Sequence, residues 1–329
     1  MPGNGLASVL VPEKDAVADV VSGRRWEERP STGAGPAEVR ADFGPRNRLA
    51  LGIRYNGQNY HGWQSQPSGR TVQDKLEAAL GAFAAQPVST LCAGRTDSGV
   101  HGLMQVVHFD TPLERTPCSW VRGTNRYLPP DIAVQWAQPV PVEFHCRASA
   151  LTRRYLYVLS QSPVRPSLDA GRVGWSMRAL DGDAMRAAAA LLIGEHDFSS
   201  FRASACQALS PVKTLRRIVI TRHADALNSR HVSDNGRDVE RCSWHFEFEA
   251  NAFLHHMIRN LMGCLVRIGQ GDASPDWISR VLAARDRDAA APTFCAAGLY
   301  FLGPLYDARW GLPAAATLQT ARAGYDALP

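Results

Sequence analysis

The segment of the chain with the clearest potential for chemistry is a glycine-bracketed turn around one aspartate. It reads Cys92-Ala93-Gly94-Arg95-Thr96-Asp97-Ser98-Gly99-Val100-His101-Gly102. Gly94 and Gly99 allow backbone conformations and close ligand approach that side chains forbid. This pattern is typical of an active-site loop, in which a carboxylate such as that of Asp97 can act as a nucleophile. The alternative is an Asx-type turn, in which the aspartate only caps its own backbone.

The composition is that of a folded protein and not of a disordered, collagen-like or coiled-coil chain. Hydrophobic residues make up 45% of the 329 residues and charged residues 20%, which are globular values. No apolar run is long enough to span a bilayer, and residues 1–14 lack the basic start and long apolar stretch of a signal peptide. We therefore expect a cytoplasmic protein with no membrane segment.

The basic residues and the cysteines give weaker indications of partner and chemistry. Lysine and arginine together number 36, for a net charge of +5, and nearly all are arginines, whose planar fork suits phosphate and base contacts. Codon bias in a GC-rich genome would give the same excess of arginine. The seven cysteines show no C-x-x-C spacing, which argues against a disulfide framework or a zinc knuckle.

Hydrophobic periodicity predicts the elements that position the Asp97 turn. In the first half we expect a helix that Thr71 opens, with Asp74 as its capping-box partner, and that Pro87 ends. Strands are predicted at 48–55, 88–93, 103–109 and 132–136, and a second helix at 117–125. The Asp97 turn then lies between two neighbouring strands.

A similar order of elements recurs after residue 150. Strands are predicted at 152–160, 215–222, 243–249 and 299–305, and helices at 183–193, at 251–268 and in a short segment that Ser274 caps. The polar stretch 223–241 is expected to be an extended hairpin loop. The fold class is therefore predicted as α+β, with two ferredoxin-like halves of βαββαβ type whose sheets join around a central cleft.

This reading divides the chain into four parts. Residues 1–46, rich in Gly, Pro, Ala and Glu, are expected to be a disordered N-terminal tail. The first half spans 47–150 and carries Asp97, the second half spans 151–307, and 308–329 form a C-terminal tail.

At the Asp97 turn the sequence resembles a known family. The stretch from Gly94 to His101 is similar to the catalytic signature of tRNA pseudouridine synthase I, the enzymes that isomerise uridines 38 to 40 of the anticodon arm. Further family-like motifs follow in order: Tyr55-Asn56-Gly57-Gln58-Asn59-Tyr60-His61-Gly62-Trp63-Gln64, Phe144-His145-Cys146-Arg147-Ala148-Ser149-Ala150, Arg153-Arg154-Tyr155-Leu156-Tyr157, Asp197-Phe198-Ser199-Ser200-Phe201-Arg202 and Asn251-Ala252-Phe253-Leu254-His255-His256-Met257-Ile258-Arg259-Asn260. The resemblance extends from about Arg48 to Tyr306.

The resemblance implies a reaction and the residues that perform it. Pseudouridine formation breaks the bond between uracil N1 and ribose C1′ and rejoins the base through C5, so no redox cofactor, nucleotide or metal is required. Asp97 matches the essential aspartate, which attacks C1′ or removes a ribose proton. Arg259 matches the arginine that pairs with it, and a guanidinium favours the ionised carboxylate. Tyr155 matches the tyrosine that stacks on the target uracil.

The resemblance also implies how the RNA is held. Arg95 matches an arginine proposed to enter the space that the target base leaves, which fits the need to flip a buried nucleotide; a plain phosphate contact is the alternative. RNA contacts are expected at Arg95, His101, Asn125, Arg154 and Arg202. The sequence departs from the family pattern at Asn56, where aspartate is usual, and at Tyr127, where an asparagine is usual.

Two adjacent histidines, His255 and His256, raise the alternative of a metal site. Neighbours on a helix point about 100° apart, which suits a shared ion poorly. No Cys or carboxylate cluster with ligand spacing accompanies them. We therefore predict no metal and no cofactor, and expect Arg259 to be carried to the cleft by a buried helix.

The sequence thus predicts a cytoplasmic tRNA pseudouridine synthase, an isomerase whose partner is the anticodon arm of tRNA. The resemblance further implies a homodimer. Two other functions fit parts of the pattern. A non-catalytic RNA-binding module would use the same ferredoxin-like sheets as a platform. A hydrolase with Asp97 as nucleophile would need further acidic residues to hold Mg²⁺, and Thr96-Asp97-Ser98 offers none.

Overall fold

The computed structural model describes residues 47–224, 231–232, 238–239 and 241–317. The N-terminal tail expected at 1–46 lies outside the described residues, as do most of the loop expected at 223–241 and the end of the chain. No helix of the described part is long and apolar enough to cross a membrane.

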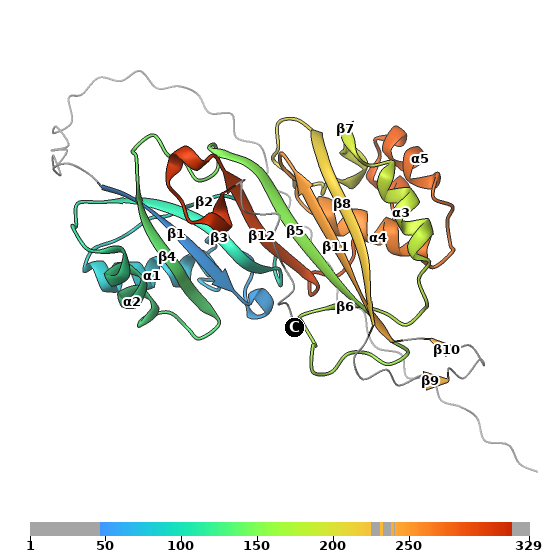
Figure 1. The fold of residues 1–329 in the computed structure, drawn as a ribbon, viewed down its shortest axis with the longest axis horizontal. Coiled ribbons are helices and arrows are strands. Elements are labelled where there is room, and N and C mark those ends of the chain that lie inside the picture. The colour runs from blue at the N-terminus through green and yellow to red at the C-terminus, as the bar shows by residue number, and fades with distance from the viewer. Residues whose placement is uncertain (1–46, 225–230, 233–237, 240, 318–329) are drawn as a thin grey trace, which may run out of the picture. The chain divides into compact units, whose positions relative to one another are not determined.

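One large mixed sheet runs through the described part of the chain (Figure 1). Its main path has the order β4-β1-β3-β12-β5-β11-β8-β7, with β2 paired to β3 and β6 paired to β5. These strands are β1 Asn47–Tyr55, β2 Leu91–Cys92, β3 His101–Thr111, β4 Ile132–Val140, β5 Ala150–Gln161, β6 Gly174–Ser176, β7 Gly194–Asp197, β8 Val212–Ala224, β11 Cys242–Ala250 and β12 Leu299–Tyr306. A separate pair joins β9 His231–Val232 to β10 Asp238–Val239. The predicted α+β class is confirmed.

Five helices of the described residues accompany the sheet in two groups (Figure 1). The first group is α1 Val72–Ala84 and α2 Pro117–Asn125, beside β1 and β4; the second is α3 Gly182–Ala190, α4 Met257–Gly269 and α5 Trp277–Ala284, beside β8 and β11. Each group covers its own hydrophobic core. Burial of these apolar side chains is the main stabilising contribution to such layers.

Strand β12 connects the parts of the sheet that flank the candidate site. It comes late in the chain yet pairs in parallel with β3 through Tyr300 and Phe301, and antiparallel with β5 along most of its length. Strand β3 follows the Asp97 turn directly, and β5 carries Tyr155. The pairing of β12 therefore brings segments of both halves of the chain to one place.

Several predicted elements form as expected. Thr71 and Asp74 make a reciprocal capping box at the start of α1, with the Thr71 hydroxyl accepting from the Asp74 N–H and the Asp74 carboxylate accepting from the Thr71 N–H. The strand predicted at 88–93 is reduced to Leu91–Cys92, because the Thr90 N–H donates to the Glu77 carboxylate at 2.7 Å and not to a neighbouring strand.

The helix predicted at 251–268 begins only at Met257. Asn251 is held in an extended connection, since its N–H donates to the Thr214 carbonyl and its side-chain oxygen accepts from the Thr214 N–H. Helix α5 likewise begins later than predicted, at Trp277, because 274–277 close a separate turn in which the Trp277 N–H donates to Ser274. Ser274 is therefore not its N-cap; that position is Asp276.

Residues 308–317, which the sequence places in a C-terminal tail, pack against the sheet. Leu312 and Ala316 are buried, and Thr317 forms a parallel bridge with Tyr306. The Trp310 ring also lies edge-on against Phe144. This segment is therefore an integral part of the fold up to residue 317.

Candidate active site

The Asp97 turn connects β2 to β3 and is held from outside by the segment that follows β1. The Trp63 N–H donates to the Thr96 carbonyl at 3.0 Å, and the Ser98 hydroxyl donates to the Tyr60 carbonyl at 3.1 Å. Gly62 has a φ of +83°, and a Cβ there would lie 2.7 Å from the Thr96 oxygen. A glycine is required at this position because of both the positive φ and the close approach.

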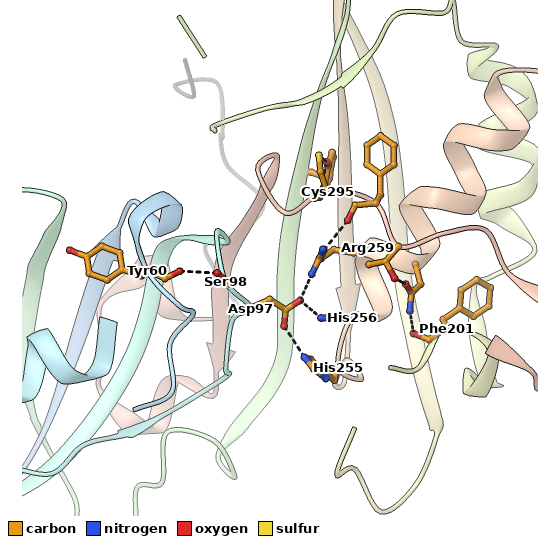
Figure 2. A network of polar contacts seen from close by, with 12 residues as sticks. Tyr60, Asp97, Ser98, Phe201, His255, His256, Arg259 and Cys295 are labelled. Carbon is orange, nitrogen blue, oxygen red and sulfur yellow. Dashed lines mark hydrogen bonds and ion pairs between the residues drawn. The ribbon is translucent and has the colours of Figure 1, made fainter. Parts of the chain in front are cut away.

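The carboxylate of Asp97 points toward the start of α4 (Figure 2). Its Oδ2 lies 3.1 Å from Nη1 of Arg259, and the Arg259 Nε donates to the Phe294 carbonyl at 2.9 Å. The two side chains are only 19% and 17% exposed. These contacts join Asp97 to a distant element, so they favour the active-site interpretation of the turn over a simple Asx cap.

Two imidazoles complete the surroundings of the carboxylate. Nε2 of His255 lies 3.4 Å from Asp97 Oδ1, and Nε2 of His256 lies 3.4 Å from Oδ2 (Figure 2). Burial lowers the pKa of His256, and the neighbouring positive groups lower it further, against the opposing effect of Asp97. His256 therefore favours its neutral form, in which one ring nitrogen carries a lone pair.

The backbone at His256 explains why both imidazoles reach the same carboxylate. The prediction that the two histidines lie on the helix is wrong: both precede α4, and His256 is its N-cap in the left-handed conformation, with φ 62°. A non-glycine residue in this conformation costs about 1–2 kcal/mol. The kink brings the two ring centroids to 4.1 Å from each other.

Arg259 occupies an electrostatically unfavourable position in its helix, and Asp97 compensates for it. Arg259 lies in the first turn of α4, where the helix dipole disfavours a cation. The Arg259 guanidinium lies 3.1 Å from the Asp97 carboxylate, and this ion pair offsets the unfavourable position of the cation.

Tyr155 lies in the same cleft, on β5. It is 9% exposed, and its ring centroid lies 4.8 Å from that of Phe301 and 5.2 Å from that of Phe253. Burial raises the pKa of its hydroxyl well above the usual value, so the group stays protonated at neutral pH. Its ring thus presents an apolar surface beside the carboxylate.

The cleft itself has a volume of about 1080 Å³. Asp97, Tyr155, Arg259, His255 and His256 line it, and Arg95, which is exposed, lines it too. Further guanidinium groups come from Arg147 and Arg153. Arg153 also donates to the carbonyls of Ala150 and Asn251, and burial lowers its pKa. A cleft of this size with several cations suits an anionic ligand larger than a single base.

The other residues for which RNA contacts were predicted have structural partners. His101 is 2% exposed: its Nδ1 accepts from the Gly57 N–H, and its Nε2 lies 3.0 Å from the Gly171 carbonyl. Asn125 exchanges two hydrogen bonds with the backbone of Val134. Arg154 is buried on β5, at 7% exposure.

Arg202 holds a loop that forms part of the cleft wall. Its guanidinium donates to the carbonyls of Cys206 and Ala208, both in a loop that lines the cleft. The Ala203 N–H in turn donates to the His255 carbonyl at 3.0 Å. Arg202 thus fixes the loop that helps to place His255.

The residues departing from the expected motif are accommodated locally. Asn56 accepts the Gln58 N–H through its side-chain oxygen and so caps a short 3₁₀ turn at Gly57–Asn59. Tyr127 is 52% exposed. The sequence did not predict that His255 and His256 lie beside Asp97. Their approach depends on the left-handed backbone at His256, and no local sequence pattern predicts that conformation.

Comparisons with known proteins show to which family the chain belongs. A sequence profile described as tRNA pseudouridine synthase matches residues 53–147 and 188–307, which include Asp97 and Arg259. The chain belongs to the tRNA pseudouridine synthase family. It is an isomerase that converts uridine in tRNA to pseudouridine.

Curated bacterial relatives are similar over nearly the whole described chain. A protein named tRNA pseudouridine synthase A from Variovorax paradoxus (strain S110) is 77% identical over 282 residues, which cover 86% of this chain and 100% of that protein. A protein of the same name from Paracidovorax citrulli (strain AAC00-1) is 69% identical over 283 residues, with the same coverage. Among solved structures, the archaeal box H/ACA sRNP Nop10-Cbf5 complex matches with a TM-score of 0.26 and 11% identity, over 74% of this chain and 59% of that chain.

Proposed function

We propose that Asp97 is the catalytic residue of this synthase and that its substrates are uridines 38, 39 and 40 in the anticodon stem-loop. The observation that carries the assignment is the contact of Asp97 with Arg259 inside the cleft. Asp97 lies in the turn that resembles the family's catalytic signature. The choice of uridines rests on that resemblance.

The arrangement suits each stage of the isomerisation. The ionised carboxylate acts on the ribose, by attack at C1′ or by removal of a ribose proton, and the N1–C1′ bond breaks. Uracil turns, C5 bonds to C1′, the proton on C5 leaves and N1 takes up a proton, so that atoms balance and no redox step occurs. The Arg259 guanidinium stabilises the charge of Asp97 before and after the step. The ring of Tyr155 supports the uracil while it turns.

The RNA is held by the cations at the mouth of the cleft. Arg95 is exposed beside Asp97, where it can fill the space left by a flipped nucleotide. Arg147 and Arg153 line the same cleft and can contact backbone phosphates. Four further residues support the fold around the cleft, because they are buried or bonded to the backbone: His101, Asn125, Arg154 and Arg202. Direct contact of these four with RNA stays a prediction.

The finer architecture is part of the same proposal. We take β1 to β4 with α1 and α2 as one ferredoxin-like half, and the elements from β5 to α5 as the other, joined through β12 around the cleft. The separate hydrophobic cores of the two groups support this division. We place the enzyme in the cytoplasm, where its tRNA substrate is found.

We further propose that the enzyme is a homodimer, since an anticodon arm is longer than one cleft. Sedimentation of the purified protein at micromolar concentration tests this, and a monomer under those conditions would contradict it.

The reaction and its residue are tested by tritium release from tRNA labelled at uridine C5. Wild type is expected to release tritium without added metal, and Asp97→Asn to release none while still binding tRNA. Transcripts with uridine at only one of positions 38, 39 and 40 then test the substrate assignment. Release of tritium from uridines elsewhere in the tRNA, with none from these three, would contradict it.

A further inference from the structure

The side chains of Asp97, His255 and His256 form a cluster whose composition matches a metal-binding site. Each offers one ligand atom, and these three atoms lie within 4.8 Å of one another. Two imidazoles and one carboxylate are a ligand set that borderline divalent metals such as Zn²⁺ accept. Both histidines precede α4, so the angle of about 100° between neighbouring helical side chains does not apply to them.

The two distances between imidazole and carboxylate are close to the spacing of neighbouring ligands around a tetrahedral metal ion. Metal bonds of about 2.0–2.2 Å to nitrogen and oxygen place neighbouring ligands of a tetrahedron about 3.3–3.5 Å apart. Nε2 of His255 lies 3.4 Å from Asp97 Oδ1, and Nε2 of His256 lies 3.4 Å from Asp97 Oδ2, so the two distances involve different oxygens of the carboxylate. One ligand atom from each of the three residues lies within 4.8 Å of the other two, and binding to a single ion requires the imidazoles to rotate toward one carboxylate oxygen.

The surroundings hold the ligands in place and leave room for the ion. His255 is fixed by its carbonyl, which accepts the Ala203 N–H, and His256 by the left-handed backbone at the start of α4. All three side chains line the 1080 Å³ cleft, so the ion can enter from solvent. Arg259, at 3.1 Å from Asp97 Oδ2, opposes a cation electrostatically. The site should therefore bind more weakly than a structural zinc site.

We propose that Asp97, His255 and His256 bind a divalent transition metal of the Zn²⁺ class, and that the bound metal inhibits the synthase by occupying the catalytic carboxylate. The ligands are one oxygen and two nitrogens, with no cysteine sulfur. The inhibition rests on the proposed function of Asp97, whereas the binding does not.

Cobalt(II) is the probe for binding, because its visible absorption reports tetrahedral coordination. The full chain is titrated with CoCl₂ alone, without tRNA. We expect one Co²⁺ to bind, and His255→Ala, His256→Asn and Asp97→Asn each to weaken binding by at least about tenfold. Asparagine is chosen at 256 because it tolerates the left-handed backbone. Arg259→Met should tighten binding, since it removes the opposing charge.

The chain offers a matched control in a second pair of neighbouring histidines. His223 and His245 have ring centroids 4.2 Å apart on β8 and β11, away from Asp97. His223→Ala should leave Co²⁺ binding unchanged. Cys206, which lines the cleft, is another potential donor. A thiolate-to-cobalt charge-transfer band that disappears in Cys206→Ser would place the metal on sulfur and overturn the proposal.

The proposal is also overturned if Co²⁺ affinity is the same in wild type, His255→Ala and His256→Asn. Inhibition is measured separately, as tritium release from wild type with increasing ZnCl₂ and after addition of EDTA. We expect release to fall with Zn²⁺ and to recover with EDTA. If wild type releases no tritium even without metal, the proposed function fails, and the Co²⁺ titration still decides whether the site exists.

Discussion

Asp97 and Arg259 are 162 positions apart in the chain, and yet Oδ2 of the one lies 3.1 Å from Nη1 of the other. Asp97 sits in the turn before β3, and Arg259 in the first turn of α4. The dipole of α4 disfavours a cation in the first turn of the helix, and the contact with the Asp97 carboxylate compensates for this. The site therefore depends on the pair and not on either charge by itself.

The first prediction concerns the carboxylate. Asp97→Asn keeps the side-chain shape and removes its charge, so tritium release should fall by at least about a thousandfold, while tRNA affinity stays within about threefold, since one charge near the reacting ribose adds little to many backbone contacts. Asp272→Asn, which removes a surface carboxylate paired with Arg178, is the control and should retain full activity. Appreciable turnover by Asp97→Asn would refute its catalytic role.

The second prediction concerns the coupling within the pair. Arg259→Met removes the cation at 3.1 Å from Asp97, and kcat should fall about a hundredfold, with a smaller effect on KM. In the double variant Asp97→Asn/Arg259→Met, kcat should be no lower than in Asp97→Asn, because the arginine then has no carboxylate to stabilise. Independent, multiplicative losses in the double variant would show that the two residues do not act as a unit.

The third prediction separates backbone strain from side-chain function at His256. His256→Gly relieves the left-handed strain at φ 62°, but glycine loses more conformational entropy on folding. The two effects oppose each other, so the free energy of unfolding should change by no more than about 1 kcal/mol. Tritium release should nevertheless fall at least about tenfold, because the imidazole beside Asp97 is lost. Thermal unfolding and single-turnover kinetics measure the two effects.

Ala85 provides the matched control for that experiment. It lies in the same left-handed region, with φ 56°, at the C-cap of α1. Ala85→Gly should change stability by a similar amount and leave activity unaltered. If His256→Gly retains full activity, the strained conformation serves only the helix start.

The fourth prediction concerns the pH dependence of stability. Burial, with Arg48 and His145 nearby, lowers the pKa of His108 to about 4, and its Nδ1 accepts the Cys146 N–H at 3.3 Å. The folded state thus keeps His108 neutral, whereas the unfolded chain protonates it below about pH 6.5. The free energy of unfolding should therefore fall as pH drops from 7 toward 4.

Replacement of His108 tests that assignment. His108→Gln should weaken the decrease in unfolding free energy between pH 7 and pH 5, measured by urea denaturation. His61→Gln, at an exposed histidine of the cleft, should leave the decrease as it is. An identical pH dependence in wild type and His108→Gln would contradict the assignment.

Much of the fold follows from local patterns in the sequence. The capping box of Thr71 and Asp74 and the alternation through β1 predict their elements, because hydrogen bonds and side-chain periodicity within a few residues decide them. The turn around Asp97 is also recognisable from its two bracketing glycines. Local patterns predict an element's bounds wrongly where a residue of another element changes the hydrogen bonding. The Thr90 N–H donates to the Glu77 carboxylate, and β2 is therefore shorter than predicted.

The sequence by itself determined most of the strands and helices, the Asp97 turn and the family motifs, since these are short-range or consecutive features. Only the tertiary structure decided which side chains surround the carboxylate. The pairing of β12 with β3 and β5 brings the Asp97 turn to α4, and the left-handed backbone at His256 aims two imidazoles at it. The same long-range packing buries His101, whose Nε2 lies 3.1 Å from the Ala297 carbonyl. No pattern within one segment encodes those contacts, because each depends on a partner contributed by another part of the chain.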